Sequence, residues 1–216
     1  MGPPGAGKGT QAKRLVDQFG LAHLSSGDLF RAEKASGSGL GKKLARYMDA
    51  GELVPDEIVV DVMARAITGN SSGPGLLLDG FPRTVPQAEA LDRQLAKAGK
   101  PLDAVMVITA GDELIVDRIT GRRSCPGCGK VYHVRNMPPR KEGVCDSCGQ
   151  ALVYRSDDSE SVVRQRLEAY NRQTEPVIAY YRARQKLKMI EVDGNREAGE
   201  VTAALVSALR ELGARG

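Results

Sequence analysis

Short apolar runs alternate along this chain with longer segments of helical pattern. The runs Gly75–Asp79 and Val105–Ile108 are each the length of one strand, and their continuous apolar character is typical of strands covered on both faces. The segments between such runs have helical spacing, as Leu91 and Leu95 illustrate. Strands that alternate with helices predict an α/β fold with a parallel sheet and helices on both faces.

This alternation predicts an order of elements. Further strands are expected at residues 22–25 and 189–192, and helices at residues 8–19, 56–67, 86–98, 112–122, 159–186 and 197–212. Pro176 should interrupt the long helix, because proline has no backbone N–H to donate. Two stretches, 25–54 and 121–158, break the alternation. We expect them to be insertions at the carboxyl edge of the sheet, where ligands bind in open α/β folds, on a core of residues 1–24, 55–120 and 159–216.

The glycine-rich segment Gly2–Thr10 fits the phosphate-binding pattern G-x-x-x-x-G-K, except that Gly9 takes the usual Ser or Thr position. Glycines let consecutive backbone N–H groups converge on an anion, and the helix that begins near Lys8 adds its positive end. The Lys8 ammonium would reach the β and γ phosphates. The segment is therefore predicted to bind phosphate groups through Gly5, Ala6, Gly7, Lys8, Gly9 and Thr10.

A loop of this kind normally follows a buried strand, but only Met1 precedes Gly2. Loss of that strand from the middle of a sheet would leave core surface and backbone groups uncovered. We expect that Met1 is an internal methionine of a longer natural chain, or that the first strand has been removed.

Composition disfavours several classes of protein. The chain has 6 Tyr, 3 Phe and no Trp, which argues against a single-strand nucleic-acid binder built on base stacking. Apolar runs fall short of the roughly 18–20 residues that a membrane helix needs, and the N-terminus lacks the regions of a signal peptide. We expect a soluble, cytoplasmic protein with neither a membrane partner nor a nucleic-acid partner.

All four cysteines lie between residues 125 and 148, as two C-x-x-C pairs separated by sixteen residues. Each pair can bring two thiolates to one ion, and four thiolates complete the tetrahedral sphere of a structural zinc. Disulfides are the alternative, but the cytosol is reducing and the chain has no cysteine elsewhere. The predicted zinc ligands are Cys125, Cys128, Cys145 and Cys148.

Two further segments complete a specific set of motifs: Leu24–Arg31, with the sequence LSSGDLFR, and Leu78–Thr84, with the sequence LDGFPRT. With them the chain resembles the adenylate kinase family over nearly its whole length, and the cysteine pairs resemble the zinc-bearing lid of the long bacterial form. The resemblance implies a P-loop kinase fold with an AMP-binding insertion at 25–54 and a lid at 121–158. It also implies reversible phosphoryl transfer from MgATP to AMP, which gives two ADP.

The resemblance assigns an AMP site residue by residue. Ser26 stands where the family usually has Thr and would contact AMP, and Arg31 would bind its phosphate. Gln87 offers an amide that can pair with adenine. The other implied AMP contacts are Glu52, Leu53, Val54, Gly80, Phe81, Pro82, Arg83, Arg155 and Arg166.

The resemblance also assigns the groups around the transferred phosphate. Guanidinium groups suit this role because they stay charged and offer a planar fork to phosphate oxygens. The implied catalytic residues are Lys8, Arg83, Arg118, Arg122, Arg155 and Arg166. Arg118 and Arg122 would bind ATP, with Val131 and Tyr132 near it and the backbone carbonyl of Arg196 at its adenine. Arg123 is adjacent to Arg122 and could replace it.

Four carboxylates and two histidines complete the implied site. Asp28 and Asp79 resemble the carboxylates that hold Mg²⁺ through its waters. Asp157 and Asp158 stand where the family has an acidic pair at the lid hinge, and they could equally cap the helix that follows. His23 is expected in the core and His133 in the packing of the lid.

Two rival functions remain open. A kinase for UMP or CMP would differ only in its acceptor, although Ser26 and Gln87 favour adenine. A P-loop ATPase that binds nucleic acid through its zinc ribbon would leave the AMP-site matches as coincidence. Residues 118–155 carry eight basic and two acidic side chains, a net charge of +6 against +4 for the whole chain, so the remainder has −2. The basic charge therefore belongs to a phosphate-facing lid, and we expect a monomer whose partners are ATP, AMP and ADP.

Overall fold

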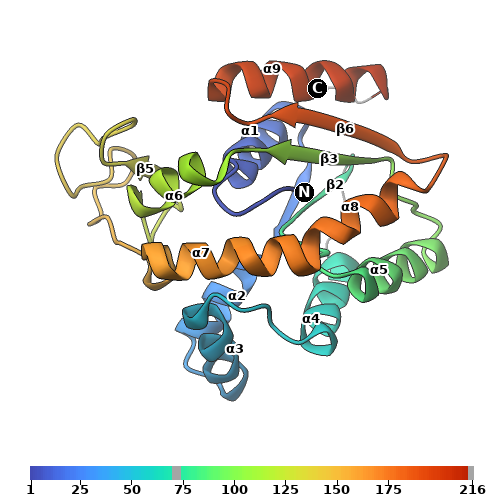
Figure 1. Ribbon diagram of the computed structural model, residues 1–216, viewed down its shortest axis with the longest axis horizontal. Helices are drawn as coiled ribbons and strands as arrows, with labels where there is room; N and C mark the ends of the chain where they lie inside the picture. The colour runs from blue at the N-terminus through green and yellow to red at the C-terminus, as the bar shows by residue number, and fades with distance from the viewer. Residues whose placement is uncertain (70–73, 214–216) are drawn as a thin grey trace.

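The computed structural model describes residues 1–69 and 74–213 and has the predicted α/β architecture (Figure 1). Its first elements are α1 Lys8–Phe19, β1 Ala22–Ser25, α2 Ser26–Ala35, α3 Gly39–Ala50, α4 Asp56–Gly69, β2 Leu76–Asp79, α5 Val85–Lys97, β3 Ala104–Thr109 and α6 Asp112–Thr120. They are followed by β4 Arg122–Ser124, β5 Val131–His133, a 3-10 turn at Ser156–Asp158, α7 Glu160–Ala169, a π-helical turn at Tyr170–Thr174, α8 Glu175–Arg182, β6 Lys188–Asp193 and α9 Ala198–Glu211. The stretches 70–73 and 214–216 of the predicted core lie outside the described residues.

The four strands of the core pair in parallel, as the alternation predicts. β1 pairs with β2, with Ser25 opposite Asp79 at their carboxyl ends, and β3 pairs with β6. Within the described residues these are two separate two-stranded ladders, and the lid contributes a third, antiparallel pair, β4 with β5. The first strand in this part of the chain is β1. Met1 lies beside β3, where its carbonyl accepts a hydrogen bond from the Ile108 N–H at 3.0 Å.

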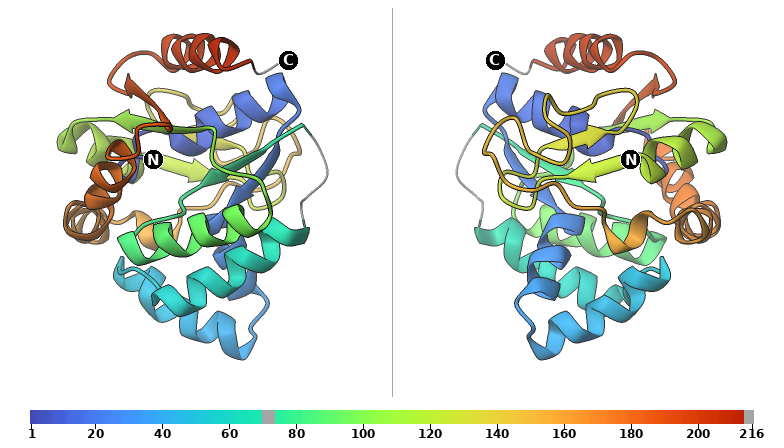
Figure 2. Two further views of the ribbon diagram at one scale, coloured as in Figure 1. Left: turned by 90° about the vertical axis from the view of Figure 1, so that its right-hand side faces the viewer. Right: turned by 90° about the vertical axis from the view of Figure 1, so that its left-hand side faces the viewer.

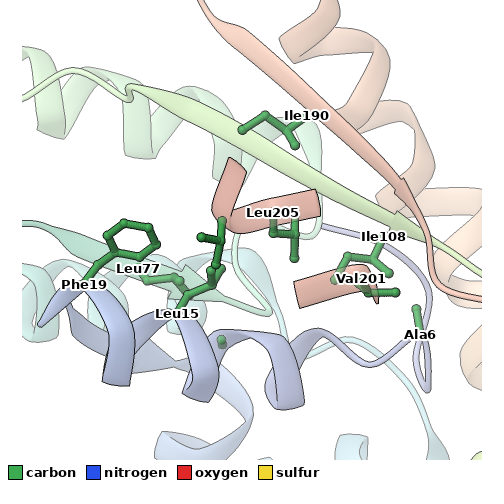
Figure 3. Close-up of a cluster of buried hydrophobic side chains, with 10 residues drawn as sticks. Ala6, Leu15, Phe19, Leu77, Ile108, Ile190, Val201 and Leu205 are labelled. Carbon is green, nitrogen blue, oxygen red and sulfur yellow. The ribbon is translucent and has the colours of Figure 1, made fainter. Parts of the chain in front are cut away.

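Helices cover both faces of the strands (Figure 2). On one face α1 and α9 bury Leu15, Phe19 and Leu205 against side chains of β2, β3 and β6 (Figure 3). On the other face α5 and α8 pack against β3, in a cluster that includes Val107 and Tyr181. β2 and β3 lie between these helix layers, and their sequences are nearly continuous apolar runs rather than alternating ones.

The long helix predicted for residues 159–186 is interrupted, as expected, but the irregularity precedes the proline. The π-helical turn at Tyr170–Thr174 joins α7 to α8, and Pro176 stands in the first turn of α8. A proline ring clashes with the carbonyl four residues earlier, so the distortion falls N-terminal to it. The predicted C-terminal bound was wrong, since α8 ends at Arg182. The helix predicted to end at residue 122 was also too long, because β4 begins there.

The two stretches that break the alternation lie beyond the carboxyl ends of β1 and α6. The first contains the helix pair α2 and α3, and the second contains β4, β5 and both cysteine pairs. No helix in residues 1–69 and 74–213 combines the length and apolar character that a bilayer crossing requires.

Candidate active site

The phosphate loop curls between Met1 and α1 through glycines with φ angles that L side chains avoid. Gly5 has φ 75° and Gly7 has φ 96°, and a Cβ on Gly5 would lie 2.9 Å from the Ile119 side chain. Gly7 caps α1, so the free N–H groups of the first helical turn face the loop. The Lys8 ammonium donates to the carbonyls of Gly2 at 2.7 Å and Pro3 at 2.6 Å. Lysine and backbone donors thus converge on one concave site.

All the residues predicted for ATP, AMP and Mg²⁺ line one cavity of about 1290 Å³. The phosphate loop and the end of β2 form its floor, while the segment after α3 and the lid contribute to its walls. Residues as distant in sequence as Arg31 and Arg196 therefore open onto the same space. The fold brings the predicted ATP and AMP residues together, although most of them are far apart along the chain.

Buried cations repel one another in this cavity. Burial lowers the pKa of Lys8 to about 8, an effect that Asp79 opposes and Arg83 reinforces. Burial likewise lowers the pKa of Arg83 and of Arg155 to about 10, with nearby arginines adding to the shift. A cluster of desolvated, mutually repelling cations is a strong site for a polyanion, since phosphate charges would relieve the repulsion.

Asp157 and Asp158 hold two other arginines of the cavity, Arg166 and Arg122. Asp158 is fully buried and accepts two hydrogen bonds from the Arg122 guanidinium, one of them from Nε at 2.9 Å. Asp157 accepts from Nη1 of Arg166 at 3.0 Å through its carboxylate and at 3.0 Å through its carbonyl. The N-cap of α7 is Ser159. These contacts with Arg122 and Arg166 favour the reading of the two residues as an acidic pair at the lid hinge over helix capping.

This pair leads to a prediction about stability. Asp158→Asn should lower the free energy of unfolding by roughly 3–5 kcal/mol, because it removes one partner of a buried ion pair. The matched control is Asp61→Asn, which breaks the exposed Asp61–Arg65 pair and should cost less than about 1 kcal/mol. Urea unfolding measures both values. Equal losses of unfolding free energy in the two variants would contradict the prediction that the buried Asp158–Arg122 pair stabilises the fold more than an exposed pair.

Two side chains donate hydrogen bonds to the carbonyl of Gly80, in the segment that follows β2. The Ser26 hydroxyl donates to this carbonyl at 2.7 Å, and Arg83 Nε donates to it at 2.7 Å. Gly80 has φ 75°, and a Cβ there would lie 2.8 Å from the Ser26 oxygen. The hydroxyl that Ser26 shares with the usual Thr therefore also positions Arg83.

The amide of Gln87 is already satisfied inside the protein. Its Nε2 donates to Asp56 at 2.7 Å and its Oε1 accepts from the Arg83 N–H at 2.8 Å. Contact between this amide and adenine, which stays a prediction, would require one of these bonds to be exchanged. The partner Asp56 was not expected from sequence, because it lies on α4, 31 residues away.

The two predicted magnesium carboxylates have different surroundings. Burial raises the pKa of Asp79, but the His23 imidazole and the Lys8 ammonium outweigh it and hold the pKa below its usual value. His23 is partly buried on β1, and its Nε2 lies 3.7 Å from the Asp79 carboxylate. Asp28 is paired with the guanidinium of Arg31, the predicted ligand of the AMP phosphate. An ionised carboxylate beside the phosphate loop suits Mg²⁺, a hard cation that prefers oxygen ligands.

The four cysteines gather in the lid as free thiols whose sulfur atoms all lie within 4.8 Å of one another. Each C-x-x-C turn is closed by a backbone bond, from Gly129 to Cys125 at 3.0 Å and from Gly149 to Cys145 at 2.9 Å. The hydrogen bond from the Tyr132 hydroxyl is the largest of the effects that lower the pKa of Cys145 to about 6. Tetrahedral zinc–thiolate bonds of about 2.3 Å place sulfurs about 3.8 Å apart, so this cluster fits the ion.

Three lid residues have contacts that are not visible in the sequence. Tyr132 lines the cavity but buries its ring under the cysteines, where its hydroxyl accepts from the Asp146 N–H at 2.8 Å. Arg123 stacks on the Tyr154 ring at 4.9 Å, so it does not replace Arg122. His133 is buried, as expected for lid packing, and its Nε2 bonds to the Asp117 carbonyl of α6 at 3.1 Å.

Comparison with known proteins decides the family. The family model described as adenylate kinase matches residues 1–186. This chain belongs to the adenylate kinase family. It is 50% identical over 211 residues to the adenylate kinase of Carboxydothermus hydrogenoformans, with 98% of each chain covered. It is 49% identical over 209 residues to that of Desulforudis audaxviator, with 97% of each covered. The adenylate kinase of Methanocella arvoryzae is 46% identical over 212 residues, which are 98% of this chain and 97% of the relative.

Membership in the adenylate kinase family confirms the predicted P-loop kinase fold and the predicted enzyme class, a nucleoside monophosphate kinase. Adenylate kinases transfer a phosphoryl group between ATP and AMP, use Mg²⁺ with ATP, and have ATP, AMP and ADP as substrates. The two rival functions are not favoured by these matches.

Proposed function

We propose that the residues around the cavity share the transfer of a phosphoryl group from MgATP to AMP as follows. Lys8 and the N–H groups of the phosphate loop bind the β and γ phosphates of ATP, and Arg118 and Arg122 also bind ATP. Arg31 and Arg83 bind the AMP phosphate, while Arg155 and Arg166 lie between donor and acceptor. The observation that carries this assignment is that all these groups line one cavity.

The chemistry needs alignment and charge stabilisation more than a general base. Charge in the transition state spreads over the equatorial oxygens of the transferred group, where fixed cations stabilise it. Asp157 and Asp158 hold Arg166 and Arg122 in place, so these arginines do not reorganise when phosphate arrives. Water competes with AMP as an acceptor, and closure of the site excludes it.

We propose that two insertions on a rigid core close over the site. We propose residues 25–54 as the AMP-binding insertion, 121–158 as the lid, and 1–24, 55–120 and 159–216 as the core. One direct contact between lid and core supports a lid that can meet α1: the Lys13 ammonium donates to the Gly129 carbonyl at 2.6 Å. Arg196 and Val131 line the cavity at the side proposed for the adenine of ATP, and Glu52, Leu53 and Val54 line it on the AMP side.

Two metals belong to this proposal. Asp79, with Asp28, would hold Mg²⁺ through its waters, and the ion would neutralise phosphate charge during transfer. A structural Zn²⁺ would join the two C-x-x-C turns of the lid, with Cys125, Cys128, Cys145 and Cys148 as its ligands. Zinc-binding cysteine pairs of this kind belong to a reducing compartment, so we place the enzyme in the cytoplasm. We propose that the enzyme acts as a monomer.

A comparison of acceptors tests the function. Formation of ADP from ATP is measured by a coupled spectrophotometric assay with AMP, UMP or CMP as the acceptor. We expect activity with AMP to exceed that with either pyrimidine nucleotide. Equal or higher activity with UMP or CMP would favour the rival kinase. Hydrolysis of ATP that depends on added DNA or RNA would favour the nucleic-acid ATPase instead.

The lowered pKa of Lys8 predicts a pH dependence of ATP binding. In the free enzyme Lys8 loses its charge as the pH rises through about 8, and phosphate binds the charged form. The affinity for ATP, measured by calorimetry from about pH 7.5 to about 9.5, should fall by up to about tenfold per pH unit above pH 8. Stability has the opposite sign: between about 8 and 10.5 the unfolded chain binds more protons, so this group makes stability rise with pH. In the Lys8→Met variant the affinity should lose this pH dependence.

A further inference from the structure

The carboxamide of Gln87 lies between two partners of fixed hydrogen-bonding polarity. The side chain is buried, with 1% of the residue exposed. Its Nε2 donates to Asp56 Oδ1 at 2.7 Å, and its Oε1 accepts from the backbone N–H of Arg83 at 2.8 Å. An ionised carboxylate can only accept hydrogen bonds, and a backbone N–H can only donate one. The two ends of the amide therefore cannot exchange places without setting donor against donor and acceptor against acceptor.

The Asp56 carboxylate is held in turn by the start of α5. Its Oδ2 accepts from the Thr84 hydroxyl at 3.0 Å, and the same hydroxyl accepts from the Gln87 N–H at 3.3 Å. Because Thr84 is the N-cap of α5, its oxygen is bonded to the backbone of that helix and its hydrogen is left for Asp56. Asp56 is the first residue of α4, which lies beside α5 (Figure 2). The network thus joins the starts of two neighbouring helices.

Only one side of this network opens onto the cavity. Gln87 and Arg83 are among the residues that line the cavity, whereas Asp56 and Thr84 are not part of that lining in the described chain. Asp56 can therefore act on a bound base only through the Gln87 amide. This makes Asp56 a positioning residue rather than a ligand.

The two hydrogen bonds of the amide differ in strength. A bond to a carboxylate is roughly twice as strong as a bond between two neutral groups. An entering base would therefore exchange the bond to the Arg83 N–H and leave the bond to Asp56 in place. Such a base meets the amide oxygen as an acceptor, while the second hydrogen of Nε2 is left for a ring nitrogen.

We propose that Asp56 selects a 6-amino purine nucleotide over a 6-oxo purine nucleotide, by fixing which end of the Gln87 amide faces the base. Adenine offers its 6-amino group as a donor and N1 as an acceptor, which matches an amide that presents its oxygen and one N–H. Hypoxanthine, the base of IMP, has the reverse pattern, with a carbonyl at C6 and a hydrogen on N1. The inference rests on the proposed transfer to AMP and adds the residue that sets the purine preference.

Asp56→Asn tests the role of the carboxylate. Asparagine has nearly the same shape but can donate as well as accept, so the Gln87 amide can turn over and present Nε2 to a 6-oxo group. We expect the ratio of kcat/KM for AMP to kcat/KM for IMP to fall about tenfold or more, because a mismatched buried bond becomes a matched one. ADP formation from MgATP measures both values. The absolute rate with IMP should rise, which a general loss of folding cannot produce.

Asp61→Asn is the matched control, because it is the same substitution on the same helix and its partner Arg65 is exposed. This variant should keep the ratio of the unmodified chain. An unchanged ratio in Asp56→Asn, equal losses with AMP and IMP, or no measurable use of IMP would overturn the role of Asp56 and leave the proposed function standing. A chain that used UMP or CMP as well as AMP would contradict the proposed function instead.

A measurement on the unmodified chain tests the same inference without a substitution. With the protein labelled with ¹⁵N, nuclear magnetic resonance follows hydrogen exchange at the side-chain amide of Gln87 before and after saturation with AMP. We expect protection to persist, because the bond from Nε2 to Asp56 is kept. Loss of that protection on binding would show that the bond to Asp56 is the one exchanged, and it would refute the proposal.

Discussion

Replacement of Lys8 by methionine is expected to lower the turnover number for ADP formation by about 10³-fold or more. Lys8 has a buried ammonium group beside the phosphate loop. In the structure this group donates hydrogen bonds to the carbonyls of Gly2 and Pro3, which phosphate oxygens would replace as acceptors. Methionine keeps the length of the side chain but removes the charge that would stabilise the transferred phosphoryl group. Steady-state kinetics with saturating ATP and AMP measure the effect.

Two controls separate this loss of activity from a loss of folding. Lys43→Met changes an exposed lysine on α3 and should leave the turnover number unchanged. Thermal unfolding of Lys8→Met should occur at the same or a higher temperature than that of the unmodified chain, because burial disfavours the charge of Lys8. A turnover number close to that of the unmodified chain would refute the assignment of Lys8.

Replacement of Cys148 by serine is expected to release zinc and to lower the unfolding midpoint by about 10 °C, while substantial activity remains at low temperature. Three thiolates hold the ion less tightly than four, and the lid has only a small buried cluster around Tyr132 to replace it. Metal analysis, calorimetry and the coupled assay measure the three effects. Ser147→Ala, at the adjacent exposed position, is the matched control and should leave zinc content unchanged.

The same experiment distinguishes a structural metal from a catalytic one. Complete loss of activity in a variant that remains folded would contradict the structural role, because the proposed phosphate ligands do not include the cysteines. Removal of metal from the unmodified chain with a chelator should reproduce the Cys148→Ser phenotype. Full zinc content in the variant would show that the four sulfur atoms do not form one site.

Local motifs could be predicted because their chemistry is contained in short segments. The glycines of the phosphate loop need their backbone angles, and Lys8 needs its place at the start of α1, so both are visible in nine consecutive residues. The cysteine pairs are visible for the same reason, since each turn places two thiols by itself. The elements of the core were predicted with errors only at their ends, because buried parallel strands are continuously apolar.

Contacts between distant segments could not be predicted in the same way. Asp158 and Arg122 are 36 residues apart, and either side chain alone would be taken for a surface charge. Asp56 satisfies the amide of Gln87 across 31 residues, and His23 approaches Asp79 only because β1 and β2 are neighbours. Burial makes these polar contacts important for stability, and burial depends on how the helices and strands pack.

Sequence alone determined the fold class, through the alternation of strand and helix patterns, and the phosphate loop and the cysteine pairs, through residue spacing within short segments. The tertiary structure decided how the arginines are held, which carboxylates hold them, and that Tyr132 packs under the cysteines. It also decided that β1 pairs with β2 and that β3 pairs with β6. The alternation of strands and helices predicts parallel strands, but only their packing determines which edges are neighbours and whether backbone groups between them find partners.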